Sequence, residues 1–258
     1  MKKGIIVNIL IAAAIIASIA LSGCTEEEVN KIIVGTSADF PPFEYVDENQ
    51  NIVGFDIDAI KNILTGQGYT VEVKDISFDS LIASLQAGKI DVIAAGMTIT
   101  EEREEQIDFS DPYFEADQSI LINADSGIIL NDIEDLINLT MGASTGTTGA
   151  IWMDDYYLER ADNDSLDQNP LKRYETYTLA ILDLENENLD AIILDKPVAQ
   201  AFEELQDFEV ALTIITNENY GFGVKKGNTE LLNDINEGLG ILQSSDDWND
   251  LITKYYLE

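Results

Sequence analysis

Short apolar runs alternate with helical patterns along the chain from residue 31 onward. The strand-like runs include 31–36, 71–76 and 90–95, and 80–86 has a helical pattern. Residues 52–64 begin as a strand and continue as an amphipathic helix. Such alternation predicts an α/β fold with mostly parallel sheets flanked by helices.

A short internal sequence similarity favours two small domains over one large domain. Residues 85–96 resemble residues 184–195, because each segment is a helix end, a turn and an apolar strand whose second residue is Asp91 or Asp190. Gly96 and Asp195 each come five residues after that aspartate, at the carboxyl end of a strand, where open α/β sheets bind ligands. Chance similarity between two helix–strand units is the alternative.

Arg103 is a candidate ligand for a carboxylate. Thr100 is predicted to cap a helix in which Arg103 is the third residue, where a cation opposes the helix dipole and favours a nearby anion. Backbone N–H groups at a helix start, together with a guanidinium, make a carboxylate site. The alternative is an ion pair with an acid such as Glu104 or Asp108.

Two further segments follow strands. The glycine- and threonine-rich loop 142–149 precedes the helical pattern 150–158, so it either receives an anionic oxygen or is a tight connection with a threonine cap. Asp195, two residues before Pro197, either caps a helix or accepts a ligand ammonium.

Four phenylalanines follow or precede the predicted strands. Phe40 and Phe78 come directly after strands, where their rings can pack on a ligand side chain or cover a cation. Phe43 and Phe55 are expected in the core.

Composition excludes several classes of function. The chain has no histidine, one cysteine and no phosphate-loop or dinucleotide-binding motif, and no metal-ligand spacing stands out among its 49 acidic residues. We therefore expect no catalytic residues, no metal and no cofactor. A net charge of −35 excludes nucleic acid as a partner and suggests a surface adapted to a saline exterior, a halophilic adaptation.

The first residues predict export. Lys2 and Lys3 precede an uncharged apolar run, which ends in Leu-Ser-Gly-Cys24. This ending resembles the lipobox of a lipoprotein signal peptide, which implies a signal peptide over 1–23, lipid attachment to Cys24 and a tether over 24–30. An uncleaved signal anchor is the alternative. Both place the chain at the outer face of the cytoplasmic membrane.

An ordered set of motifs resembles the polar amino-acid family (family 3) of extracytoplasmic solute-binding proteins that serve ABC importers. The motifs are 34–44 (VGTSADFPPFE), 53–58 (VGFDID), 81–97, 98–103 (TITEER), 107–114 (IDFSDPYF), 146–148 (GTT), 190–197 (DAIILDKP) and 220–226 (YGFGVKK). The resemblance implies a two-lobe periplasmic-binding-protein (Venus flytrap) fold with two crossing hinge strands. Lobe 1 would comprise 31–116 and 219–258, and lobe 2 would comprise 117–218.

The resemblance also implies residue roles. Arg103 would hold the ligand's α-carboxylate with help from Thr98 and the backbone around Thr148, while Asp195 and the Gly96 carbonyl would hold its α-ammonium. Phe40 and Phe78 would pack on the ligand side chain. Selectivity for that side chain is assigned to Ser37, Asp39, Glu44 and Ser144. Ser37 replaces an acid found in histidine and glutamine binders, whereas Asp39 or Glu44 would suit arginine or lysine.

The predicted function is a monomeric, lipid-anchored receptor, not an enzyme, that binds a free polar or charged L-amino acid and delivers it to an ABC transporter permease. Two alternatives remain on the same fold. One is an enzyme similar to cyclohexadienyl dehydratase, with Asp195 or Glu44 as a general acid. The other is a sensory ligand-binding protein.

Overall fold

The computed structural model describes residues 30–160, 171–255 and 257, and residues 31–258 form one compact unit. The predicted signal peptide, Cys24 and all but the last residue of the tether lie outside the described residues. Within the described ranges, no helix combines the length and hydrophobicity needed to span a bilayer.

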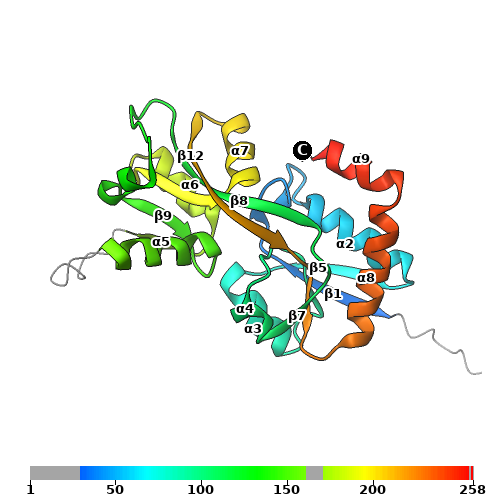
Figure 1. Cartoon of the computed structure of the whole chain (residues 1–258). Helices are drawn as coiled ribbons and strands as arrows, with labels where there is room; N and C mark the ends of the chain where they lie inside the picture. Colours follow the sequence, from blue (N-terminus) through cyan, green and yellow to red (C-terminus); the bar gives the residue numbers. More distant parts are fainter. Residues whose placement is uncertain (1–29, 161–170, 256, 258) are drawn as a thin grey trace, which may run out of the picture. The chain divides into compact units, whose positions relative to one another are not determined.

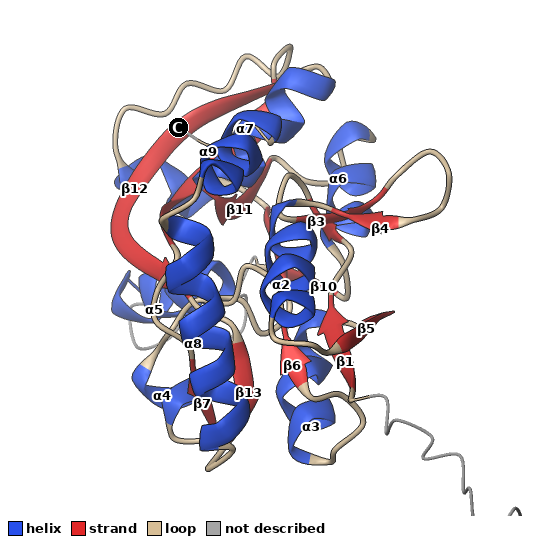
Figure 2. Cartoon of the chain, turned by 90° about the vertical axis from the view of Figure 1, so that its right-hand side faces the viewer, coloured by secondary structure: helices blue, strands red, loops and turns tan. Residues whose placement is uncertain are grey.

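The first sheet contains five strands in the order β5-β1-β6-β13-β7. Their bounds are β1 (Lys31–Thr36), β5 (Thr70–Asp75), β6 (Val92–Ile93), β7 (Ile107–Phe109) and β13 (Gly223–Lys225). The helices of this part are α2 (Phe55–Gly66), α3 (Leu81–Gln86), α4 (Glu101–Glu104), α8 (Thr229–Gln243) and α9 (Asp246–Lys254). Helices α2 and α8 approach closely at Gly238, where an added Cβ would lie 2.8 Å from Cγ2 of Ile63 (Figure 2).

The second sheet has the order β10-β9-β11-β8-β12. Its strands are β8 (Phe114–Asn123), β9 (Met141–Ser144), β10 (Lys172–Tyr174), β11 (Ala191–Asp195) and β12 (Phe208–Tyr220). Its helices are α5 (Thr148–Arg160), α6 (Tyr177–Glu185) and α7 (Lys196–Leu205), with the 3₁₀ helix η2 (Ile133–Asn138). The 3₁₀ turn η1 (Phe78–Ser80) precedes α3, and a small sheet is formed by β2 (Asp39–Phe40), β3 (Glu44–Val46) and β4 (Ile52–Val53).

Two long antiparallel strands, β8 and β12, carry the chain between the two sheets (Figure 1). Strand β8 follows β7 of the first sheet, and β12 leads back to β13 of the same sheet. The chain therefore folds as two α/β lobes with two connecting strands, as predicted. The lobe boundaries at 116/117 and 218/219 stay a prediction.

Both sheets are mixed, although the sequence predicts mostly parallel sheets. In the first sheet, β1 pairs in parallel with β5 and β6, while β13 pairs antiparallel with β6 and β7. The second sheet likewise has two parallel and two antiparallel pairings. Parallel neighbours need a crossover connection, whereas β8 and β13 enter their sheets from the other lobe and can run antiparallel. Strand β12 returns the chain toward the first sheet, so it runs opposite to β8.

The two similar segments, 85–96 and 184–195, each begin their strand with an aspartate that makes the same kind of contact. Asp91 accepts a hydrogen bond from the backbone N–H of Ile33 at 2.8 Å, and Asp190 accepts one from the backbone N–H of Thr140 at 2.6 Å. In each lobe, an aspartate at the strand start thus ties that strand to its parallel neighbour. The predicted strand 90–95 is buried except at the half-buried Asp91, but only Val92 and Ile93 pair regularly before the chain turns at Gly96, whose φ is +49°.

The core contains Phe43 and Phe55, both fully buried as predicted. Their rings meet edge to face with centroids 6.2 Å apart, and Gly54 lies directly before Phe55. Gly54 has a φ of +136°, and an added Cβ would lie 2.1 Å from the carbonyl oxygen of Phe43. Only glycine fits this close approach.

We expect Gly54→Ala to lower the free energy of unfolding by at least about 1–3 kcal/mol, because the backbone must leave a conformation reserved for glycine. Urea unfolding measures this change. The control is Gly240→Ala in α8, where nothing lies within 4 Å of the added Cβ and alanine should stabilise the helix by about 0.5–1 kcal/mol. Equal unfolding free energies for Gly54→Ala and wild type would contradict the packing described here.

Candidate functional site

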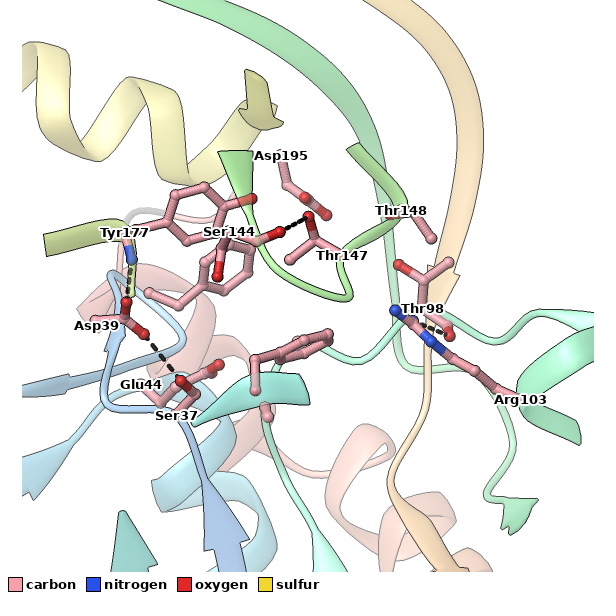
Figure 3. Close-up of a pocket in the computed structure, with 14 residues that line it drawn as sticks. Ser37, Asp39, Glu44, Thr98, Arg103, Ser144, Thr147, Thr148, Tyr177 and Asp195 are labelled. Carbon is pink, nitrogen blue, oxygen red and sulfur yellow. Dashed lines mark hydrogen bonds between the residues drawn. The ribbon is translucent and has the colours of Figure 1, made fainter. Parts of the chain in front are cut away.

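One pocket brings together all eleven residues that the sequence analysis assigns to ligand binding (Figure 3). These are Ser37, Asp39, Phe40, Glu44, Phe78, Gly96, Thr98, Arg103, Ser144, Thr148 and Asp195. Three residues that the sequence analysis did not name as site residues also line it, namely Ala95, Thr147 and Tyr177. The role of each residue toward a ligand stays a prediction.

Strand ends position most of these side chains. Ser37 follows β1, Phe78 opens the turn shortly after β5, and Gly96 lies beyond β6. In the other lobe, Ser144 ends β9 and Asp195 ends β11. The carboxyl ends of parallel strands from both lobes therefore face one pocket, as expected for a ligand site in open α/β sheets.

Arg103 is buried, and its guanidinium contacts carbonyl oxygens. The Thr100 hydroxyl accepts a hydrogen bond from the Arg103 backbone N–H at 3.2 Å, so Thr100 is the helix cap as predicted. The guanidinium donates to the carbonyl oxygens of Thr98 at 2.7 Å and Gly146 at 3.0 Å, and the side chain is 6% exposed. It lies 5.3 Å from the centre of the Phe78 ring.

The ion-pair alternative for Arg103 is wrong. Within the described part of the chain, no carboxylate lies within 4 Å of Arg103, and Asp108 pairs instead with Lys226 at 2.7 Å. A guanidinium has five N–H donors, so the two carbonyl contacts leave donors for an anionic group. Burial lowers the pKa of Arg103, while the charges of Asp195 and Glu218 act in the opposite direction.

Asp195 is the carboxylate of the other lobe. It lies at the N-cap position of α7, but its side chain makes no capping hydrogen bond, so the capping alternative is wrong. The carboxylate accepts hydrogen bonds from the Gln118 amide at 2.9 Å and from the Tyr220 hydroxyl. Burial, followed by repulsion from Glu218, raises its pKa from 3.8 to about 7.

Glu44 is a buried carboxyl in the pocket wall. It is fully buried, and neither of its oxygens has a hydrogen-bond partner among the described residues. Burial raises its pKa well above the usual value, and the charges of Asp56, Asp39 and Asp195 act in the same direction. Asp39 differs, because it accepts hydrogen bonds from the Ser37 hydroxyl at 3.1 Å and from the Tyr177 backbone N–H.

Gly96 and Phe40 form a tight part of the wall. An added Cβ on Gly96 would lie 2.7 Å from the Phe40 ring, and the Gly96 N–H donates to Asp56 at 2.8 Å. Phe40 stacks on Tyr177 with ring centroids 5.6 Å apart. Phe40 and Phe78 thus contact Tyr177 and Arg103, respectively, as well as lining the pocket.

Tyr177 opens α6 shortly after β10, so it also follows the carboxyl end of a parallel strand, where ligand-binding residues are expected. The sequence does not reveal this strand, because β10, at Lys172–Tyr174, is too short to show a periodic pattern. Thr147 lies in the predicted loop next to Thr148. Nothing in the sequence singled out Glu218, whose contacts depend on the register of β12.

The sequence profile described as bacterial extracellular solute-binding proteins, family 3, matches residues 32–258. The chain is 31% identical to a probable histidine-binding protein of Neisseria gonorrhoeae, over 86% of this chain and 82% of that protein. It is 30% identical to the arginine-binding extracellular protein ArtP of Bacillus subtilis (strain 168), over 99% of this chain and 98% of that protein.

Two solved structures are also similar to the chain in sequence and fold. A mutant of ArgBP from T. maritima has 42% identity and a TM-score of 0.81, covering 89% of this chain and 96% of that one. An ancestral arginine-binding protein bound to arginine has 36% identity and a TM-score of 0.81, covering 88% and 98%.

The raised pKa of Asp195 predicts a pH-dependent stability. A carboxyl whose pKa rises on folding stabilises the fold fully below its unfolded pKa near 3.8, and this contribution is lost as the pH rises through about 7. We therefore expect the free energy of unfolding to fall more between pH 5 and pH 8 in wild type than in Asp195→Asn.

Urea unfolding at both pH values measures the difference. Asp47→Asn is the control, because a hydrogen bond from the Asn51 N–H lowers the pKa of the exposed Asp47 and places its titration below this range. Equal losses of stability in wild type and Asp195→Asn would contradict the prediction.

Proposed function

Because the chain belongs to family 3 of the bacterial extracellular solute-binding proteins, we propose that it captures a cationic L-amino acid, arginine or lysine, and delivers it to an ABC importer. The relatives named above include arginine- and histidine-binding proteins, which supports an amino-acid ligand. The buried Glu44 carboxyl is the observation that carries the choice of a cationic side chain.

The pocket has one end for each charge of an amino acid. Arg103 keeps N–H donors for the α-carboxylate, with Thr98 and the backbone at Thr148 beside it, while Asp195 and the Gly96 carbonyl receive the α-ammonium. The two groups come from different lobes. A zwitterion that contacts both stabilises the closed arrangement through its greater affinity for that state.

The pocket wall has more acidic side chains than the α-ammonium of an amino-acid ligand requires. Its charged lining residues are Arg103, Asp39, Glu44 and Asp195. Asp39 bonds to Ser37 and Tyr177, which leaves Glu44 as the acid with no partner among the described residues. A buried unpaired carboxylate is costly, and a guanidinium or ammonium near Glu44 would stabilise its charged form.

We propose further that Cys24 carries the lipid anchor, that the protein is a monomer at the outer face of the cytoplasmic membrane, and that its acidity suits a saline exterior. The leader supports the lipid anchor and the location, and the net charge of −35 supports the saline exterior. The enzyme alternative, similar to cyclohexadienyl dehydratase, remains as an outcome of the experiment below.

A thermal-shift screen of the twenty amino acids tests the function. A ligand at 100 times its dissociation constant adds about 2.7 kcal/mol of stability, so we expect arginine and lysine to raise the melting temperature most. A screen in which no amino acid raises it would contradict the proposal. Turnover of a carboxylated cyclohexadiene in place of binding would favour the enzyme.

Glu44→Gln tests the assignment of the ligand side chain. We expect it to weaken arginine about 10- to 100-fold, because a hydrogen-bonded charge pair contributes about 1.5–3 kcal/mol, and to change citrulline binding by less than threefold. Citrulline has the same shape as arginine but a neutral urea group. Isothermal titration calorimetry measures both affinities, and equal losses for the two ligands would show that Glu44 does not face the side chain.

A further inference from the structure

Glu218 lies in the connecting strand β12 just after an irregularity. The pairing of β12 with β8 shifts register between Ile214 and Glu218, and Asn217 has a φ of +51°. Such a bulge re-aims the side chains that follow it. Regular pairing resumes at Glu218 opposite Ala116.

The Glu218 carboxylate contacts both lobes. One oxygen accepts hydrogen bonds from the hydroxyls of Thr98 at 2.8 Å and Thr148 at 2.6 Å. The other oxygen accepts one from the Gln118 amide at 3.1 Å. Thr98 belongs to the segment that leads to Arg103, whereas Thr148 begins α5 of the other lobe, and both threonines line the pocket.

These contacts use the protons of both hydroxyls. A threonine hydroxyl has one O–H donor, so a hydroxyl that donates to Glu218 cannot also donate to a second anion. Both threonines lie where the ligand carboxylate is expected, next to the guanidinium that donates to the carbonyl oxygen of Thr98. Two carboxylates cannot share these donors, and like charges at short range repel.

We propose that Glu218 is an internal competitor for the ligand carboxylate and sets the affinity and selectivity of the site. This inference rests on the proposed amino-acid function. The Glu218 carboxylate holds the hydroxyl protons of Thr98 and Thr148, and a ligand carboxylate at Arg103 must displace it from them. Glu218 thereby lowers the affinity for ligands that carry a carboxylate, relative to matching ligands without one.

A role for Glu218 that only orients the two hydroxyls would give a different result. If Glu218 merely orients the hydroxyls so that their oxygens accept from the ligand ammonium, its removal would weaken ligands with and without a carboxylate alike. Loss of its charge would also weaken any cationic ligand. The informative quantity is the ratio of the affinities for arginine and agmatine. Agmatine, which lacks the carboxylate, has one more net positive charge than arginine, so loss of the Glu218 charge alone raises this ratio. The Glu218→Gln variant, which loses the same charge but keeps an acceptor oxygen, measures that charge effect.

The experiment compares arginine with agmatine, which is arginine without its carboxylate, by calorimetry on the full-length chain in detergent. We expect Glu218→Ala to raise the ratio of arginine affinity to agmatine affinity by about tenfold, because two hydroxyl donors become available to the ligand carboxylate. Glu218→Gln keeps the size and an acceptor oxygen but not the charge, so it should raise the ratio less. The Glu218→Gln variant also provides a test if the alanine variant does not fold.

Glu209→Ala is the matched control. Glu209 is an exposed glutamate on the same strand, and its removal should leave the ratio unchanged. A ratio that stays the same or falls in both Glu218 variants, or that rises equally in both, overturns the inference. A wild-type protein that binds neither ligand would instead overturn the proposed function.

Discussion

The site depends on a buried guanidinium held by carbonyl oxygens rather than by an acid. The chain has 49 acidic and 14 basic residues, so an unpaired arginine must be kept from many available partners. Arg103 is held at a helix start by the Thr100 cap, by the carbonyls of Thr98 and Gly146, and against the Phe78 ring. These contacts orient the charge without neutralising it, which leaves it available to an anion.

The acids of the pocket complement this cation. Asp195 ends a strand of the other lobe, and hydrogen bonds from Gln118 and Tyr220 hold its carboxylate in the pocket that Arg103 also lines. Glu44 adds a further acid without a partner among the described residues. The pocket has more buried acids than buried bases, which is the physical reason to expect a cationic ligand. Burial raises the pKa of Glu44 and Asp195, and a bound cation would stabilise their charged forms.

Much of this arrangement is predictable from the sequence, because strand ends define the site. Gly96 and Asp195 follow buried apolar runs that are easy to recognise. The alternation of strands and helices predicts the α/β class, and the similarity between residues 85–96 and 184–195 favours two domains. The mixed direction of the sheets is not predictable this way, because β8, β12 and β13 join the lobes without crossover helices. Tyr177 follows a strand of only three residues, which is too short to show a periodic pattern. The position of Glu218 depends on a register shift that has no local signal in the sequence.

A crystal structure of the protein with bound arginine is the most direct test of the two-ended pocket. The predicted result is an α-carboxylate within hydrogen-bond distance of the Arg103 guanidinium, an α-ammonium at Asp195 and a ligand guanidinium at Glu44. An arginine bound with its carboxylate away from Arg103, or with its guanidinium away from Glu44, would contradict the assignment of the two ends and of the side-chain site.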